Sequence, residues 1–395
     1  MRTKIFHCFV LFLIIIHISV CDMFFLGTSI WSYLTTLCEV VFIVVAVQYF
    51  KKVGKFDRIE KLGAFYFIFI LFFSIINGLP NTNIVSLIGR AIEIATVLML
   101  FHLNRDNLNP LLLAGTITLS ICVYCNFYLV WLNPIGIIDM EGDPYFLLGT
   151  NYNQIGPKVL CAIVFNILLL DTTKITWVNL FFLSYAGIYS LFLVGSMTSL
   201  VSISFFLTVF ILSYLLKGKL NKLFFVIGIS FVLLFQVFVV FEGDTLMNSD
   251  ALSFLNLIGK DITFTGRTKL WSYSSDYFWD SPIWGHGFIS PREYAYSGFF
   301  HGIMKNSHNY IYNVMHKGGI ILFITVFLLL KTCYDRVKID IKKQTAFVVL
   351  MAAVVFMIMS LFEAYETYYV FLISTFMFYY PYLQKSNSKL CKQYQ

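Results

Sequence analysis

The sequence predicts an all-α integral membrane protein with about twelve transmembrane helices, and three observations support this fold class. Of the 395 residues, 59% are hydrophobic and only 12% are charged, a composition that excludes a soluble domain. Apolar runs of about 20 residues recur from end to end, each long enough to cross a hydrocarbon core of about 30 Å as a helix. Most Lys and Arg residues lie between these runs, so the net charge of +7 reports membrane topology rather than a nucleic-acid partner.

Five spans are expected in the first part of the chain. The first begins after Arg2 and Lys4, and we treat it as a span rather than a cleaved signal because Val20 is too bulky for the position before a lipoprotein-type Cys21. The second span ends in a dense cluster of Lys and Arg, so the positive-inside rule places that connector and the N-terminus in the cytoplasm. The five spans cover residues 5–26, 30–50, 62–78, 84–101 and 110–131.

Seven further spans follow, and the charges of their connectors alternate as a multi-pass topology requires. The expected exterior connector 133–154 contains no Lys or Arg, whereas the connector after the tenth span and the C-terminal tail are basic. The chain therefore divides into residues 1–241 with helices one to nine, a large exterior loop at 242–307 that carries the candidate site, and residues 308–395 with helices ten to twelve and a cytoplasmic tail. The seven spans cover residues 155–170, 177–194, 198–216, 223–241, 308–330, 346–362 and 365–382.

Charged side chains inside the expected spans are candidates for substrate contacts, because each is costly in hydrocarbon unless it is paired or faces a polar cavity. Arg90 and Glu93 are three positions apart in the fourth span and share a helix face. They either neutralise one another or place Arg90 at a substrate. Lys158 follows the segment GTNYNQIGP at the outer mouth of the sixth span, where a cation beside a helix start is suited to a phosphate.

Neither the cysteines nor the acidic residues indicate a metal or redox centre. Cys122 and Cys125 form an isolated Cys-x-x-Cys inside the fifth span, where a buried helix face explains them better than a metal, and the eight cysteines suggest no disulfide framework. Glu141 and Asp143 have the acidic-x-acidic spacing of some divalent-cation sites, but such spacing is common in polar loops. We therefore expect no metal and no cofactor.

The long polar interval from Phe264 to Gly319 is the candidate functional region. Arg267, Arg292 and His308 lie there among Trp, Tyr and Gly residues, so cationic and titratable groups meet flat apolar faces at the expected membrane surface. This combination suits an anionic, lipid-linked sugar.

Four segments occur in a fixed order around these positions: GTNYNQ before the sixth span, GSMTSL opening the eighth, GRTKLW with SPIWGHGF in the large loop, and SHNYIYNVMHKGG leading into the tenth. Over about residues 149–330, their order and topology resemble the O-antigen polymerase and O-antigen ligase family of bacterial envelope glycosyltransferases. The resemblance implies a multi-pass protein of the bacterial cytoplasmic membrane whose large exterior loop acts on an undecaprenyl-diphosphate-linked glycan. The chain departs from the family at Met197, where members usually have an arginine.

The chemistry of such a substrate assigns roles to the charged residues. A sugar on a polyprenyl diphosphate is already activated, so transfer needs stabilisation of the departing diphosphate and a group that accepts the proton of the attacking hydroxyl. Arginine binds phosphate oxygens in pairs and keeps its proton, which favours Arg267 and Arg292 for the first task. Neutral imidazole accepts protons near neutrality, which favours His308 as the base.

Other readings of this region stay open at the sequence level. His308 beside Asn309 could instead cap the tenth span, and Asn309 could contact substrate. Trp271 could stack on a sugar ring, although interfacial anchoring explains tryptophans in such loops equally well. His286, between Gly285 and Gly287, is interpreted as a turn residue.

The function that fits best is polymerisation of undecaprenyl-diphosphate-linked repeat units into a capsular, exo- or O-antigen-type polysaccharide at the outer face of the cytoplasmic membrane. The alternatives are a ligase with another acceptor and a twelve-helix transporter, although the chain shows no repeated halves and its longest connector follows the ninth span. A composition rich in Phe, Ile, Asn and Lys hints at an AT-rich genome, and Gram-positive cells have no lipid A core to ligate, which favours the polymerase. The expected partners are the lipid-linked glycan, membrane lipid, a flippase and a chain-length regulator, with no nucleic acid.

Overall fold

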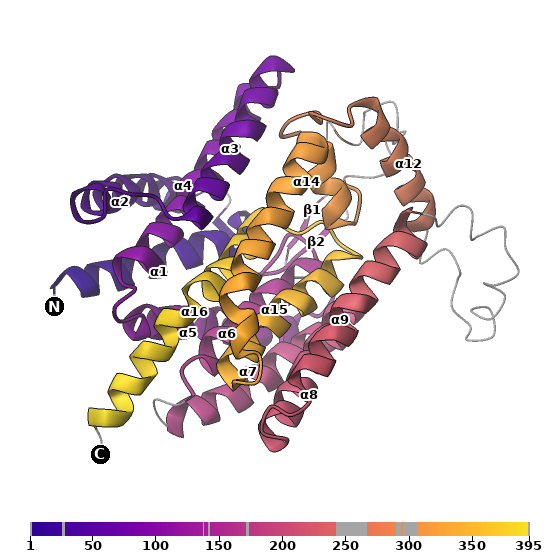
Figure 1. The fold of residues 1–395 in the computed structure, drawn as a ribbon. Coiled ribbons are helices and arrows are strands. Elements are labelled where there is room, and N and C mark those ends of the chain that lie inside the picture. Colours follow the sequence, from indigo (N-terminus) through magenta and orange to yellow (C-terminus); the bar gives the residue numbers. More distant parts are fainter. Residues whose placement is uncertain are drawn as a thin grey trace, which may run out of the picture.

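The computed structural model describes residues 2–25, 28–136, 138–140, 143–170, 174–241, 267–289, 294 and 306–393, and it confirms a helical, multi-pass architecture (Figure 1). Twelve of the described helices coincide with the twelve expected spans. Eight helices in the described part are long and apolar enough to cross a membrane, and two further apolar helices are shorter. The twelve helices are α1 (Arg2–Ser19), α2 (Ile30–Lys52), α3 (Arg58–Ile76), α4 (Asn81–Leu103), α5 (Asn109–Leu132), α6 (Ile155–Ile167), α7 (Lys174–Leu193), α8 (Met197–Leu215), α9 (Asn221–Phe235), α14 (Tyr310–Val337), α15 (Gln344–Ser360) and α16 (Thr367–Gln393).

The remaining described elements lie between these helices. A two-stranded antiparallel hairpin, β1 (Ile138–Met140) and β2 (Asp143–Tyr145), follows α5. A helix outside the set of expected spans, α12 (Arg267–Asp280), lies beyond the end of α9 in Figure 1. The short segments are a π-helical turn at Gln236–Phe241 and 3₁₀ turns at Asp22–Phe25, Tyr152–Gln154 and Lys338–Asp340.

Helix α6 forms the centre of the bundle. All 13 of its residues are buried, and it packs against α5, α7, α8 and α15. The outer helices instead expose large apolar side chains, such as Ile43 on α2 and Val226 and Phe231 on α9. Exposed apolar side chains on such helices are what a hydrocarbon environment requires. The arrangement therefore surrounds one buried helix with helices whose outer faces suit lipid.

Helix α14 is broken, which the continuous tenth span expected from the sequence did not anticipate. Gly318 and Gly319 have non-helical backbone angles, and Gly319 has a φ of 59°. A Cβ on Gly319 would lie 2.2 Å from the carbonyl oxygen of Ile283, so only glycine lets the loop after α12 approach this closely. That loop supplies backbone partners at the break, where the Ile320 N–H donates to the Pro282 carbonyl at 2.8 Å. The break is thus satisfied by protein groups, as a buried irregular backbone requires.

Four segments meet at one end of the bundle, which we call the site end: residues 146–154, 194–196, 306–309 and 361–366. They are the connectors before α6, α8, α14 and α16. Each carries a polar residue that takes part in the hydrogen-bond network described next. The Lys- and Arg-rich connectors lie at the opposite end of the bundle, so the positive-inside rule predicts that the site end faces the outside.

Candidate functional site

The imidazole of His308 and the carboxylate of Glu363 are hydrogen-bonded at the site end. The imidazole Nδ1 of His308 lies 3.1 Å from Oε1 and 3.2 Å from Oε2 of Glu363. The Glu363 side chain is 2% exposed and the His308 side chain 28% exposed, so the carboxylate is the buried partner and the imidazole faces outward. Among the described residues, none hydrogen-bonds to Nε2 of His308. With Nδ1–H donated to the carboxylate, Nε2 keeps a free lone pair that can accept a proton.

Backbone geometry also fixes His308. Its φ is 45°, in the left-handed region that side chains other than glycine rarely adopt. Its backbone N–H donates to the Asn306 side-chain oxygen at 2.8 Å, which supports this conformation. Uncommon backbone angles at a polar, half-buried residue are typical of functional positions.

The Asn-rich segment before α6 supplies the second partner of Glu363. Asn153 Nδ2 donates to Glu363 Oε2 at 2.9 Å, and Ser196 Oγ lies 3.4 Å from Asn153 Oδ1. The side chain of Asn151 accepts from the backbone N–H groups of Asn153 and Gln154 and so caps the 3₁₀ turn that presents Asn153. The segment GTNYNQ therefore positions a donor against the buried carboxylate.

Arg267, at the start of α12, brings a positive charge to the same place. Its guanidinium carbon lies 5.9 Å from the centroid of the Phe362 ring, next to Glu363 in the chain. Burial opposes the charge of Glu363, but the hydrogen bond from His308 and the positive charges of His308 and Arg267 outweigh it and hold the pKa of Glu363 below its ordinary value of 4.5. The carboxylate is thus ionised at neutral pH, between an imidazole and a guanidinium.

Asn309, rather than His308, caps α14. Asn309 Oδ1 accepts from the Tyr312 backbone N–H at 3.1 Å, and Nδ2 donates to Gln236 Oε1 at 3.0 Å and to the Leu361 carbonyl at 3.1 Å. Asn309 is fully buried and joins the start of α14 to the segment carrying Glu363, and its expected contact with substrate stays a prediction. The alternative in which His308 serves as the cap is wrong.

Two expected substrate-binding residues, Trp271 and Lys158, are buried. Trp271 is fully buried and lies edge-on to Phe235, with ring centroids 6.4 Å apart, so its indole packs inside the protein instead of offering a face to a sugar. Lys158 is also buried, and its Nζ donates to the Leu148 carbonyl at 2.6 Å. Lys158 therefore links the segment after the hairpin to α6, and the expected phosphate contact stays a prediction.

Arg90 is paired, but not with the residue expected from the sequence. It forms an ion pair with Glu366, in the connector between α15 and α16, whereas Glu93 pairs with His17 of α1. Arg90 and Glu93 are therefore not each other's ion-pair partners. Tertiary packing brought two distant partners to this helix face, which spacing along one helix could not reveal.

Several expected residues lie outside the described part of the chain. Arg292 and Glu141 belong to this group, as does the side chain of Asp143. The proposed phosphate role of Arg292 therefore stays a prediction, and so does the expectation of no metal at Glu141 and Asp143.

Glu363 and Asn153 were not among the expected site residues, although one signal pointed to Glu363. Glu363 and Glu366 are the only charged residues between Lys343 and Lys385, in a short connector between two apolar spans. Charges in such a place are expensive and require partners. No comparable signal singles out Asn153, because asparagine is common in loops and turns.

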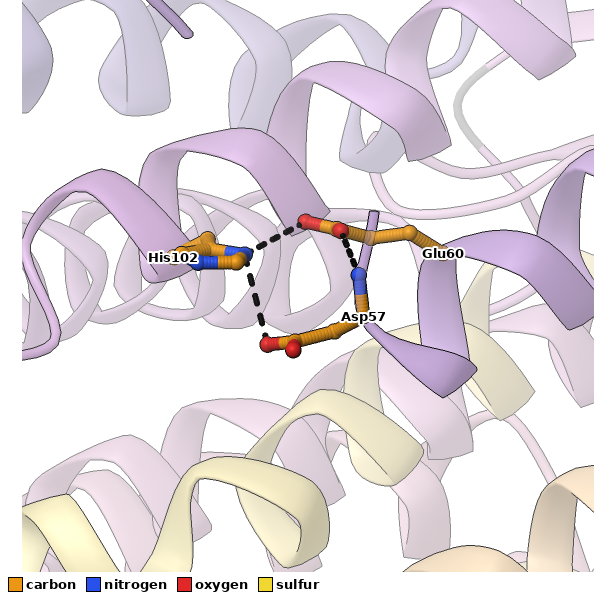
Figure 2. Close-up of side chains that lie close together, drawn as sticks. All are labelled: Asp57, Glu60 and His102. Carbon is orange, nitrogen blue, oxygen red and sulfur yellow. Dashed lines mark hydrogen bonds and ion pairs between the residues drawn. The ribbon is translucent and has the colours of Figure 1, made fainter. Parts of the chain in front are cut away.

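A second polar cluster lies at the opposite end of the bundle and has the composition of a metal site (Figure 2). Asp57 and Glu60 at the start of α3 and His102 near the end of α4 place their donor atoms within 4.8 Å of one another. His102 Nδ1 lies 3.0 Å from Glu60 Oε1 and 3.3 Å from Asp57 Oδ2, and its Nε2 lies 3.1 Å from Arg105 Nη1.

The hydrogen bonds of this cluster favour a structural role. Arginine can only donate, so Nε2 of His102 must accept from Arg105 and Nδ1 must carry the proton toward the carboxylates. A metal would need the Nδ1 lone pair and would leave Nε2–H facing the guanidinium. In addition, the Asp57 N–H donates to Glu60 Oε2 at 2.6 Å, which forms half of a capping box for α3. The cluster therefore ties the α2–α3 connector to α4 without a metal.

A family model described as O-antigen ligase matches residues 180–327, which confirms the resemblance to this family of membrane glycan-processing proteins. No curated protein matches the chain. The matched stretch contains Ser196, Arg267, His308 and Asn309, whereas Asn153 and Glu363 lie on either side of it.

Proposed function

Because residues 180–327 match the O-antigen ligase family, we propose that the protein is a glycosyltransferase that polymerises undecaprenyl-diphosphate-linked repeat units into a surface polysaccharide. The reaction would take place at the outer face of the bacterial cytoplasmic membrane. The observation that carries the proposal is the His308–Glu363 pair, whose imidazole is partly exposed and whose carboxylate also feels the charge of Arg267.

The proposed reaction forms one glycosidic bond and breaks one phosphate ester linkage. The acceptor hydroxyl oxygen attacks the anomeric carbon, and its proton passes to Nε2 of His308. The bond from the anomeric carbon to the diphosphate oxygen breaks, and the diphosphate leaves with the electron pair. The Glu363 carboxylate stabilises the imidazolium that forms, while Asn153 holds the carboxylate in place.

Arg267 would stabilise the charge that develops on the departing diphosphate. A guanidinium offers paired N–H donors that match phosphate oxygens and stays charged at all working pH values. Its place at the start of α12, near but not hydrogen-bonded to Glu363 in the described contacts, leaves these donors available. Arg292 is proposed as a second phosphate ligand on chemical grounds alone.

A ligase is the second candidate, since it would use the same chemistry with a different acceptor. The family match is itself described as O-antigen ligase, which supports this reading equally. The distinguishing feature is the acceptor, a second lipid-linked repeat unit in a polymerase and another glycolipid in a ligase. A flippase that delivers the substrate and a chain-length regulator are proposed as partners of the polymerase.

The arginine assignment is tested with Arg267→Lys, which keeps the charge but loses the paired donors. Using purified protein in lipid nanodiscs and a lipid-diphosphate-linked repeat unit, we expect turnover to fall by about 10–100-fold with unchanged protein level. Arg58→Lys, on an exposed arginine at the opposite end of the bundle, is the matched control and should behave as wild type. Equal turnover in the two variants would remove Arg267 from the site.

The base assignment is tested with His308→Gln, which keeps hydrogen-bonding capacity but cannot titrate. We expect turnover to fall by about 10²–10⁴-fold, the usual contribution of a positioned general base. A parallel assay in EDTA should leave the wild-type rate unchanged, since no step of the proposed reaction uses a metal. Normal polymerisation by His308→Gln would refute the base, and loss of activity in EDTA would redirect attention to Glu141 and Asp143.

A further inference from the structure

A buried histidine of α14 joins this helix to α12. His316 is 2% exposed, and its Nε2 lies 2.8 Å from the backbone carbonyl oxygen of Ser274 in α12. Its Nδ1 lies 2.7 Å from the Tyr294 hydroxyl. A carbonyl oxygen can only accept, so Nε2 carries the proton and Nδ1 accepts from the tyrosine O–H. One tautomer of the neutral imidazole therefore satisfies both ring nitrogens.

The backbone around His316 also holds the loop that follows α12. The His286 N–H donates to the His316 carbonyl at 2.7 Å, and the Gly287 N–H donates to the Lys317 carbonyl at 3.1 Å. The ring of His286 stacks on the ring of Tyr277 in α12, with centroids 4.0 Å apart and 16° between the planes. Both α12 and the loop behind it are therefore attached to the turn of α14 that precedes its break.

The contact at Ser274 bears on Arg267, because the two residues lie on one face of α12. They are seven positions apart, which is two turns or about 10 Å of α-helix. Seven residues return a helix to the same face within about 20°. A hydrogen bond at Ser274 therefore fixes the position of α12 along α14 and, with it, the place from which the Arg267 side chain extends.

Aromatic packing continues this interface toward the arginine. The ring of Tyr312 stacks on the imidazole of His316, with centroids 5.7 Å apart, and Tyr312 shares one buried cluster with Trp271 of α12. Phe362 packs against that cluster, and the guanidinium carbon of Arg267 lies 5.9 Å from the centroid of its ring. The interface thus leads from the His316 contact to the arginine.

A directional contact matters in such an interface. Apolar burial has no preferred direction, so aromatic surfaces alone let packed helices slide, whereas a hydrogen bond weakens steeply when its geometry changes. Buried polar groups whose partners are all present specify one arrangement of a core. A displacement of about 1 Å at a reacting group can lower a rate by about 100-fold. A small shift of α12 would move Arg267 relative to Glu363 and His308.

We propose that His316 is a positioning residue, which holds α12, and through it Arg267, at the place beside Glu363 that the transfer reaction requires. The inference rests on the proposed function, since Arg267 is assigned there to the departing diphosphate. Because its side chain is buried and both ring nitrogens are engaged, His316 acts by geometry and not by contact with the substrate.

The test is a double-mutant cycle between His316→Phe and Arg267→Ala, measured as turnover in lipid nanodiscs. Phenylalanine keeps a flat ring but cannot donate to the Ser274 carbonyl. We expect His316→Phe alone to lower turnover by about 10–100-fold. The double variant should match Arg267→Ala within about 2-fold, because a displaced α12 costs nothing further once the guanidinium is absent. Losses that multiply would show that His316 acts independently of Arg267 and would overturn the proposal.

Further variants separate positioning from stability. Glutamine at this position can still donate an N–H to the Ser274 carbonyl, so His316→Gln should recover most of the turnover, whereas the shorter side chain of His316→Asn should not. If His316→Phe does not fold, this comparison decides, and equal turnover in the glutamine and asparagine variants overturns the proposal.

His7→Phe is the matched control. His7 is also 2% exposed and has hydrogen bonds to two neutral side chains, those of Gln48 and Asn104, at the opposite end of the bundle. The control should lower the thermal midpoint as His316→Phe does, but it should leave turnover per folded protein unchanged. An equal loss of turnover in the two phenylalanine variants would reduce the effect of His316 to stability and would overturn the proposal.

Binding of undecaprenyl diphosphate separates this inference from the proposed function. Arg267 would contact the diphosphate whether or not a polymer forms, so His316→Phe should bind it about 10-fold more weakly than the wild type does. If the wild type polymerises and His316→Phe equals it in turnover and binding, the positioning role is refuted while the proposed function stands. If no polymer forms but diphosphate affinity depends on His316 and Arg267 in the same non-additive way, the positioning role stands and the polymerase assignment falls. A wild type that neither polymerises nor binds the diphosphate would refute both.

Discussion

The substitution Glu363→Gln separates the chemical role of the site from its structural role. The Glu363 carboxylate accepts from His308 Nδ1 and Asn153 Nδ2 and is almost fully buried. Glutamine keeps the shape and one acceptor oxygen but loses the charge. A neutral amide cannot stabilise the imidazolium that forms as His308 takes the acceptor proton.

The expected size of the effect follows from the contacts. One hydrogen bond to a charged group contributes about 1.5–3 kcal/mol, and this contribution is largest when the imidazole is charged. Turnover should therefore fall by about 10–100-fold, less than for His308→Gln, since the base itself is still present. The free energy of unfolding should change by no more than about 1–2 kcal/mol, because the lost charge–charge contacts are offset by the lower cost of burying a neutral side chain.

The assay compares turnover and thermal unfolding of the wild type and Glu363→Gln in the same nanodiscs. Because folding lowers the pKa of Glu363 below 4.5, the unfolded chain binds this proton at a higher pH than the folded protein. The stability from this carboxylate is thus present above about pH 4.5 and lost as the pH falls toward the folded pKa. Any stability difference between the two proteins should shrink over that range. Wild-type turnover in Glu363→Gln would refute the positioning role.

Three further predictions test the fold. Gly319→Ala should lose about 1–3 kcal/mol through its φ of 59° alone, and more through the contact with Ile283. The control Gly89→Ala, with open space around it in the interior of α4, should instead be as stable as the wild type or more stable by up to about 1 kcal/mol. Ile135 and Ile339 have similarly exposed side chains, at 88% and 86%, but are expected on opposite sides of the membrane. With the native cysteines replaced, Ile135→Cys should react with an impermeant thiol reagent from outside and Ile339→Cys should not. The reverse pattern would invert the topology. His102→Ala should lower the thermal midpoint through lost buried hydrogen bonds, while EDTA should leave the wild-type midpoint unchanged, and a metal-dependent midpoint would contradict the structural role of the Asp57–Glu60–His102 cluster.

The sequence predicted the helices well because hydrocarbon imposes a simple rule. Every backbone group must be satisfied within its own span, so apolar length alone locates helices such as α3 and α8. The broken helix α14 escaped prediction, since its Gly318–Gly319 pair is satisfied by a loop some 35 positions earlier in the chain. Such a contact depends on tertiary packing and leaves no periodic signal.

The candidate site was predicted in part. Arg267 and His308 were expected from residue chemistry, and both lower the pKa of Glu363. The identity of the partner could not be predicted, because Glu363 and His308 are more than fifty positions apart and belong to different connectors. Trp271 and Lys158 were assigned to substrate because their side chains suit sugars and phosphates, but burial decides whether a suitable side chain is available.

The two glutamates of the α15–α16 connector explain why the site end can hold several cations before substrate arrives. Glu363 and Glu366 supply negative charge to His308, Arg267 and Arg90, which would otherwise repel one another across a weakly hydrated region. Their exposures differ, at 2% for Glu363 and 32% for Glu366, and so does the cost of moving them. The proposed function requires the buried carboxylate to stay beside His308, because it would stabilise the imidazolium that forms when His308 takes a proton. Neutralising Glu363 should therefore slow the reaction.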